Sequence, residues 1–197
     1  MRFSNHSTLS NFPYKVILGS QSPRRKELFS NLNIPFSIKV IPTNESYPKG
    51  LSNGEVAEFI AQQKAVAFSL SEKELVVTAD TIVCLGNQVL GKPTDEQEAI
   101  HMLRQLSNCS HDVITGVCIR TVNKQVLFSD TTKVFFRELS VEEINYYVRT
   151  FLPFDKAGSY GIQEWVGQVG IDRIEGSYFN VMGLPTNKLY SALLKMI

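Results

Sequence analysis

The sequence lacks the features that identify several common classes of protein. Its three cysteines, an odd number without a CxxC pair, argue against a disulfide framework or a zinc site and favour reduced thiols in the cytoplasm. No apolar run approaches the roughly 20 residues that cross a bilayer, and residues 1–8 lack the apolar segment of a secretory signal. We therefore expect a cytoplasmic protein without a membrane partner, in which residues 1–12 form a flexible N-terminal tail.

An excess of charge of one sign is also missing. The 20 Lys and Arg residues nearly balance the 19 Asp and Glu residues, and no long basic run is present, so we expect no nucleic-acid partner. The GxSxG, HExxH and paired CxxC motifs are absent, which removes the common hydrolase and zinc-enzyme templates. Of the three histidines, His111 opens a predicted strand and is better explained as structural than as catalytic.

The composition is that of a globular protein with a sizeable core. Apolar residues make up 43% of the chain and charged residues 20%. Strand and helix patterns alternate, and two segments rich in Val, Ile, Thr and Phe then predict a long antiparallel hairpin over 111–121 and 125–137. These patterns predict an α/β fold, a mixed twisted sheet flanked by helices, with two lobes around a central cleft as one arrangement. We expect a single domain over residues 13–197, because no long linker divides it.

The remaining elements follow from hydrophobic periodicity and capping residues. Helices are expected over residues 23–32, 55–70, 94–106, 140–150 and 186–196, and further strands over 14–19, 36–41 and 75–85. Thr94, with Gln97 three residues later, is the expected N-cap of the third of these helices.

Positive charge gathers at the first predicted helix start. Ser22 is a good N-cap and Pro23 a good first residue, which places Arg24–Lys26 in the first turn. The helix dipole makes this end positive already, so each cation there is unfavourable by roughly 0.3–1 kcal/mol. Two interpretations are open. Ser20–Arg25 forms an anion pocket in which N–H and guanidinium groups bind phosphate oxygens, or the arginines pair with carboxylates elsewhere at a solvated helix end.

Two other charges fall where apolar residues are expected. At about 100° per residue, Lys64 shares the arc of its helix that carries Ala57 and Ile60, so it either snorkels to the surface or reaches into a polar pocket. Asp80 interrupts the apolar strand 75–85, where a carboxylate is costly unless it is paired, hydrogen-bonded or bound to a metal. It is either a structural aspartate at a bulge or a functional one. The apolar residues that continue beyond it favour function.

Residues 86–93 nearly match the P-loop pattern GxxxxGK[ST]. Pro93 stands where the magnesium-binding hydroxyl belongs, and Val89–Leu90 favours a short return strand, so we reject a P-loop. The pattern instead predicts a hairpin that brings Lys92 near the end of the strand containing Asp80. The later run Asp155–Gln163, with two glycines and an amide, is typical of a ligand-shaping loop and of many other loops.

Together these segments resemble the Maf family, the septum-formation-protein-like nucleoside triphosphate pyrophosphatases, from about Lys15 to the C-terminus. The matching motifs, in family order, are Ser20–Leu28 (SQSPRRKEL), Ala79–Val83 (ADTIV), Gly91–Pro93 (GKP), Thr115–Val117 (TGV), Asp155–Gln163 (DKAGSYGIQ) and Gly176–Pro185 (GSYFNVMGLP). Each motif alone is weak. All of them, in order and across almost the whole chain, are highly specific.

The resemblance implies a house-cleaning hydrolase that cleaves a nucleoside triphosphate between its α and β phosphates, with a divalent cation, Mg²⁺ or Mn²⁺. Asp80 matches the catalytic aspartate of the family. Glu45 matches an acidic position near the metal, and Asp80 would hold this metal together with Glu45. The phosphate-binding residues implied by the resemblance and by the charge pattern are Ser20, Arg24, Arg25, Lys64 and Lys92. The positions linked to substrate choice are Arg24, Thr81 and Gln163.

The run Asp155–Gln163 resembles the branch of the family that acts on dTTP and UTP, with modified pyrimidine triphosphates as further candidates. Ser159 and Glu164 depart from the alanine and glycine common there, and both lie near the loop that would read the base. A sister branch prefers 7-methyl-GTP and is the alternative enzyme. A nucleotide-binding regulator of cell division with little turnover is the alternative outside the enzymes, and the intact catalytic set argues against it. The family also implies a homodimer.

Overall fold

A computed structural model describes residues 12–197, so the predicted tail over residues 1–12 lies almost entirely outside the described residues. The strands are β1 (Lys15–Leu18), β2 (Phe36–Ile38), β3 (Glu74–Leu85), β4 (Gln88–Leu90), β5 (Ser110–Arg120), β6 (Gln125–Phe136) and β7 (Ile171–Glu175). The α-helices are α1 (Pro23–Ser30), α2 (Asn53–Val66), α3 (Glu96–Leu106), α4 (Val141–Phe151), α5 (Trp165–Gly170), α6 (Tyr178–Met182) and α7 (Thr186–Leu194). Two 3₁₀ turns, η1 (Pro153–Asp155) and η2 (Ala157–Ser159), follow α4.

The strands form one seven-stranded sheet in the order β2-β1-β3-β5-β6-β7, with β4 paired to β3. Strand β1 runs parallel to β2 and β3, whereas the other pairs are antiparallel, which confirms the predicted mixed sheet. The expected hairpin is β5 and β6, whose register runs from Ser110 opposite Phe135 to Arg120 opposite Gln125.

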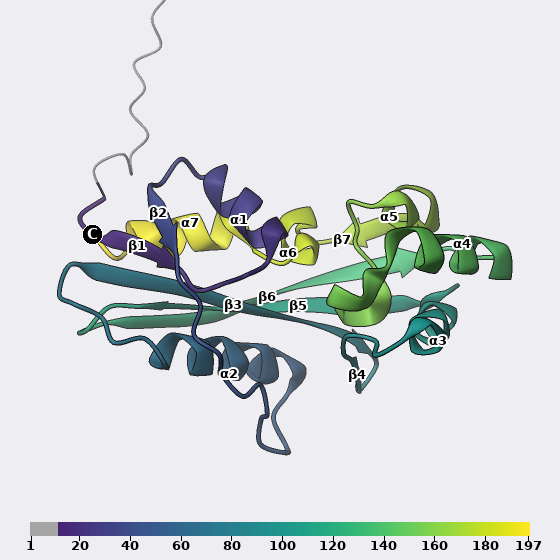
Figure 1. Ribbon diagram of the computed structural model, residues 1–197, viewed down its shortest axis with the longest axis horizontal. Coiled ribbons are helices and arrows are strands. Elements are labelled where there is room, and N and C mark those ends of the chain that lie inside the picture. The colour runs from purple at the N-terminus through teal and green to yellow at the C-terminus, as the bar shows by residue number, and fades with distance from the viewer. Residues whose placement is uncertain (1–11) are drawn as a thin grey trace, which may run out of the picture.

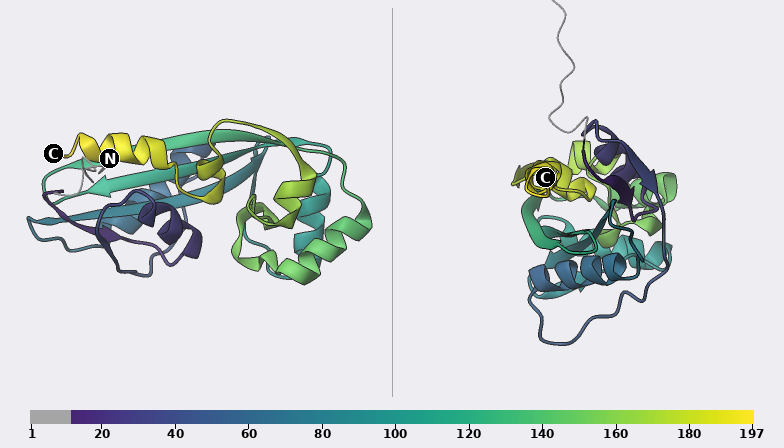
Figure 2. Two further views of the ribbon diagram at one scale, coloured as in Figure 1. Left: turned by 90° about the horizontal axis from the view of Figure 1, so that it is seen from above. Right: turned by 90° about the vertical axis from the view of Figure 1, so that its left-hand side faces the viewer.

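Helices cover both faces of this sheet. Helix α2 lies on one face, and α1, α6 and α7 lie on the other (Figure 1). Helices α3, α4 and α5 gather at one end of the long strands, so that the helices form two groups along the sheet (Figure 2). This arrangement corresponds to the two lobes predicted from the sequence. Because helices cover both faces, β3 and β5 are buried along most of their length.

Helix α2 rests directly on β5 at Gly116. It begins at a capping box, in which the Ser52 hydroxyl accepts from the N–H of Glu55 and the Glu55 carboxylate accepts from the N–H of Ser52. A Cβ on Gly116 would lie 2.2 Å from the carbonyl carbon of Ala57, so only glycine lets the two backbones approach this closely. The close packing fixes the height of α2 above β3, and with it the reach of Lys64.

Some predicted boundaries are wrong, for identifiable reasons. Thr94 does not cap α3. The Asp95 carboxylate accepts from the N–H of Glu98 at 2.8 Å, and the Glu98 carboxylate accepts from the N–H of Thr94 at 2.7 Å. Strand β2 ends at Ile38 rather than residue 41, because its partner strand β1 ends opposite it at Leu18. Within residues 12–197, none of the helices has the length and apolar character needed to cross a membrane.

Candidate functional site

A cavity of about 450 Å³ lies where α1 and α2 approach the segment that follows α4. Its lining comes from α1, α2, the loop before α2, strands β3 and β5, the β3–β4 hairpin, the segment from η1 to Gln163 and the end of α6. The predicted residues that line it are Arg24, Arg25, Glu45, Lys64, Asp80, Thr81, Lys92 and Gln163. Ser20 lines an adjoining cavity of about 500 Å³ that shares Arg24, Lys64 and Lys92 with the first. Folding thus brings residues from distant segments into one connected space.

Lys64 lies between two carboxylates in this cavity. Its Nζ is 2.6 Å from Oδ1 of Asp80 and 2.8 Å from Oε1 of Glu45. The side chains of Lys64 and Asp80 are only 16% and 13% exposed, so Lys64 reaches into a polar pocket rather than snorkelling. Strands β3 and β5 pair without a break at Asp80, opposite Gly116, which removes the bulge considered from the sequence.

The positive charge around Glu45 changes its acidity. Burial alone would raise the pKa of its carboxyl. The hydrogen bond and charge of Lys64, together with the charges of Lys92 and Arg25, outweigh burial and hold this pKa below its usual value. Glu45 is therefore ionised at neutral pH, as a ligand for a cation must be.

The two arginines at the start of α1 have different surroundings. Arg25 donates from Nε to the carbonyl of Gly183 at 2.8 Å, from Nη1 to the carbonyl of Ala79 at 2.8 Å, and from Nη2 to Oγ1 of Thr81 at 2.9 Å. Burial lowers its pKa below the usual value. Arg25 therefore ties α1 to β3 and to the turn after α6, and these three bonds leave two of its five N–H groups for a ligand.

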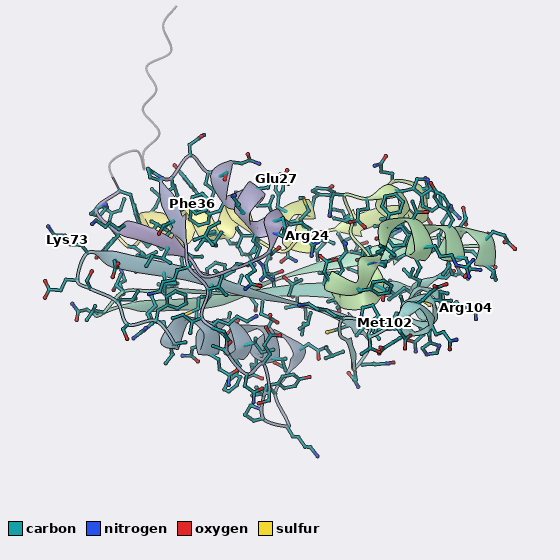
Figure 3. All side chains as sticks on the ribbon, viewed as in Figure 1. Arg24, Glu27, Phe36, Lys73, Met102 and Arg104 are labelled. Atoms are coloured by element: carbon teal, nitrogen blue, oxygen red, sulfur yellow. The ribbon has the colours of Figure 1, made fainter. Side chains whose placement is uncertain are left out.

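Arg24, labelled in Figure 3, lies at the start of α1 in the middle of the molecule. Its Nη1 donates to Oδ2 of Asp155 at 3.0 Å, the kind of carboxylate pairing that one of the two sequence interpretations proposed. The same side chain lines both cavities, as the anion-pocket interpretation requires. Lys26 is exposed and lines neither cavity.

Thr81 and Gln163 differ in the hydrogen bonds that they leave open. The Thr81 hydroxyl accepts from Arg25 and shares a 2.9 Å hydrogen bond with Thr115, whose own hydroxyl donates to the carbonyl of Asn180. The Thr81 hydroxyl therefore donates its proton to Thr115 rather than to a ligand. The buried Oε1 of Gln163, by contrast, has no hydrogen-bond partner among the described residues. Gln163 lines the cavity, so a ligand N–H that reaches this oxygen would supply the missing hydrogen bond.

The sequence reasoning missed a chain of charged groups at the Gln163 end of the cavity. Lys156 Nζ lies 2.6 Å from Oδ1 of Asp155 and 3.1 Å from Oε1 of Glu164. The hydroxyl of Tyr147 donates to the other oxygen of Glu164. Burial, and then the nearby Glu164, raise the pKa of Tyr147, which keeps this donor protonated. The only available signal was the Asp-Lys pair that opens the glycine-rich run, and loop lysines are ordinarily exposed.

Buried aromatic rings pack behind this end of the cavity. Nε2 of His111 and the hydroxyl of Tyr160 are 2.7 Å apart, and both side chains are buried. Burial lowers the pKa of His111 to about 4, so its ring is neutral at pH 7. This placement agrees with the structural assignment of His111 made from the sequence.

Glu45 and Asp80 are the residues that could hold a divalent cation. Their oxygens already converge on one point, the Lys64 ammonium. Among the described residues no group of three or more His, Cys, Asp or Glu side chains forms a metal cage. Magnesium suits such an incomplete site, because it commonly binds one or two carboxylates and takes its other ligands from substrate phosphates and water.

Comparison with known proteins agrees with these observations. The Maf family model, described as Maf-like protein, matches residues 15–196. A dTTP/UTP pyrophosphatase of Phocaeicola vulgatus is 53% identical over 186 residues, which cover 93% of this chain and 96% of that protein. The protein of the same name from Flavobacterium psychrophilum is 51% identical over 182 residues, covering 91% and 93%. The motifs, the arrangement of the site and these relatives together place the chain in the Maf family.

Proposed function

We propose that this protein is a nucleoside triphosphate pyrophosphatase that hydrolyses dTTP and UTP to the monophosphate and pyrophosphate. The observation that carries the proposal is the convergence of Asp80 and Glu45 on Lys64 in a cavity with further cations on its wall. The similar proteins named dTTP/UTP pyrophosphatase support the choice of substrate. Modified pyrimidine triphosphates that keep the N3–H and carbonyl edge of uracil or thymine are further candidates.

The phosphates would lie where the two cavities meet. Arg24, Lys64 and Lys92 line both cavities and supply positive charge for a ligand with several negative charges. Positioned cations of this kind stabilise the charge that develops on the phosphate oxygens as the α–β bond breaks. Ser20 and the two open N–H groups of Arg25 add hydrogen-bond donors on the same side of the site.

We also propose a divalent cation, Mg²⁺ or Mn²⁺, held by Glu45 and Asp80. When bound, it would neutralise phosphate charge and lower the pKa of bound water. Asp80 is the residue to accept a proton from the attacking water. The water oxygen would then bond to the α phosphorus, and the bridging oxygen would leave with pyrophosphate. Lys64, beside Asp80, is placed to donate to phosphate oxygens as this happens.

The base would lie at the end of the cavity that carries Gln163. The unpaired Oε1 of Gln163 is an acceptor for N3–H of uracil or thymine. No observation in the described residues favours the 7-methyl-GTP alternative or a regulator without turnover. The homodimer, the cytoplasmic location and the absence of a nucleic-acid partner remain predictions from the sequence.

A substrate panel tests the proposed reaction. We expect that dTTP and UTP with Mg²⁺ release pyrophosphate, and that CTP, dATP and GTP react much more slowly. Chelation of the metal should abolish release. Preference for 7-methyl-GTP would establish the alternative enzyme, and orthophosphate with a nucleoside diphosphate would contradict the proposal.

A further inference from the structure

Lys156 is a buried cation for which the proposed chemistry has no task. It lies between η1 and η2, its side chain is 8% exposed, and it lines the cavity together with Gln163. Burying an ammonium is unfavourable unless it is paired, and here Asp155 and Glu164 provide the pairing. These two carboxylates occupy at most two of its three N–H donors. At least one donor is left on a side chain that belongs to the cavity wall.

The ammonium and the Gln163 amide belong to the same end of the cavity. A Cβ built on Gly161 would lie 3.0 Å from Nε2 of Gln163 and 3.0 Å from Cδ of Glu164, the carboxylate that pairs with Lys156. The amide and this carboxylate therefore flank one backbone position. The same end of the cavity thus combines a donor that cannot accept, on Lys156, with an unpaired acceptor, on Gln163.

Lys156 and Gln163 together can distinguish uracil or thymine from cytosine, which an amide alone cannot. Uracil and thymine present N3–H between two carbonyl oxygens, whereas cytosine presents an unprotonated N3 beside an amino group. A glutamine can rotate its amide by 180° and pair with either edge, because it carries both a donor and an acceptor. An ammonium only donates, so it can pair with the O4 carbonyl of uracil but not with the amino group of cytosine.

We propose that Lys156 is a specificity-determining residue whose ammonium donates to O4 of a uracil or thymine base, while Gln163 accepts from N3–H. The inference rests on the proposed function, since it concerns the base of the same nucleotide. Glu164, held by Tyr147, and Asp155 position the ammonium. Asp155 also accepts from Arg24, so one carboxylate connects the base end of the site to the phosphate end.

The test is binding of non-hydrolysable α,β-methylene analogues of UTP and CTP, measured by calorimetry for the wild type and for Lys156→Met. We expect the wild type to prefer the UTP analogue by at least about tenfold, the scale of one hydrogen bond to a charged donor. Lys156→Met should weaken the UTP analogue by about tenfold and the CTP analogue by less than about threefold. The UTP-to-CTP preference is then lost.

Lys92→Met is the matched control, because it removes the same charge from the same cavity at the phosphate end. It should weaken both analogues alike and leave their ratio unchanged. Lys156→Met combined with Glu164→Gln removes the buried partner charge and serves as a second variant if the single one does not fold. Lys156→Arg keeps a group that only donates and should retain part of the preference.

Three results would overturn the inference. They are a wild type that binds both analogues equally, a folded Lys156→Met protein whose affinities do not change, and a folded Lys156→Met protein in which both analogues are weakened equally, as a merely structural lysine would produce. A different result would contradict the proposed function without contradicting the base contact. If the wild type prefers the UTP analogue and Lys156→Met loses that preference, but no pyrophosphate is released from UTP, the reaction is wrong and the base contact stands.

Discussion

A single lysine organises the acidic part of the site. Two carboxylates that approach the same point repel each other unless a cation lies between them. The Lys64 ammonium fills that place, at 2.6 Å from Asp80 and 2.8 Å from Glu45. A divalent cation would compete for the same oxygens and free the ammonium for the phosphates. The protein thus keeps the ligands of the proposed metal close together while Lys64, a proposed phosphate-binding group, neutralises them.

Replacing Asp80 tests the proposed chemistry at this residue. Asp80→Asn keeps the size of the side chain, but an amide neither accepts the proton nor binds a hard cation as a carboxylate does. We expect kcat/KM for UTP to fall by at least about 100-fold. Thermal unfolding should change little, because Lys64 still pairs with Glu45.

Asp130→Asn is the control for this substitution. Asp130 lies on β6, is 15% exposed and pairs with Lys188 at 2.6 Å, which closely matches the setting of Asp80, but it does not line the cavity. Its substitution should leave kcat/KM within about threefold of the wild type. Equal activity of the two variants would show that Asp80 has no part in the reaction.

At the scale of elements, the packing of α2 on β5 determines where Lys64 lies. Gly116→Ala would place a methyl group 2.2 Å from the Ala57 carbonyl carbon, so α2 must move. We expect the free energy of unfolding to fall by at least about 2 kcal/mol. Activity should fall further than stability explains, because α2 carries Lys64. Thermal unfolding and kcat/KM on the same samples measure both effects.

Gly54→Ala, in helix α2, serves for comparison. The nearest atom to its new methyl group is the Ser129 hydroxyl oxygen at 3.5 Å, an ordinary contact. Its effect on the free energy of unfolding should stay within about 0.5 kcal/mol. If Gly116→Ala behaves in the same way, then α2 is not fixed by close contact with β5.

The sequence predicts most elements because their signals are local. Periodicity and capping residues are enough for α4, which begins at a capping box formed by Ser140 and Glu143. Boundaries that depend on a partner are less predictable. Strand β2 ends where β1 ends. Helix α2 stops at Val66 rather than at residue 70. At this end of the helix, Arg120 on β5 donates to the carbonyls of Ala65 and Phe68.

The residues of the site likewise divide into those with a local sequence signal and those without one. Asp80 and Lys64 could be singled out because each is a charge in an otherwise apolar pattern. Lys156 lies in an irregular loop, where no periodicity separates a buried side chain from an exposed one. The bond from Arg25 to the carbonyl of Gly183 joins residues 158 positions apart. Such a bond exists only after folding, so the internal role of Arg25 could not be inferred from the chain.

At the scale of the whole molecule, the long strands hold two chemically different regions side by side. The region around α1 and α2 supplies the cations proposed to bind phosphate and the paired carboxylates, and the segment after α4 supplies Gln163 and Lys156. The cavity lies between them. A nucleoside triphosphate has the same two parts, a charged phosphate chain and a base edge with fixed donors and acceptors, and the proposed function rests on this match.

The most direct measurement is ³¹P NMR of UTP incubated with the protein and Mg²⁺, because it identifies every phosphorus product at once. Cleavage between the α and β phosphates predicts UMP and pyrophosphate in equal amounts, with no UDP. The Asp80→Asn protein should give the same products at least about 100-fold more slowly. UDP with orthophosphate, or unchanged UTP in the presence of folded wild-type protein, would contradict the account.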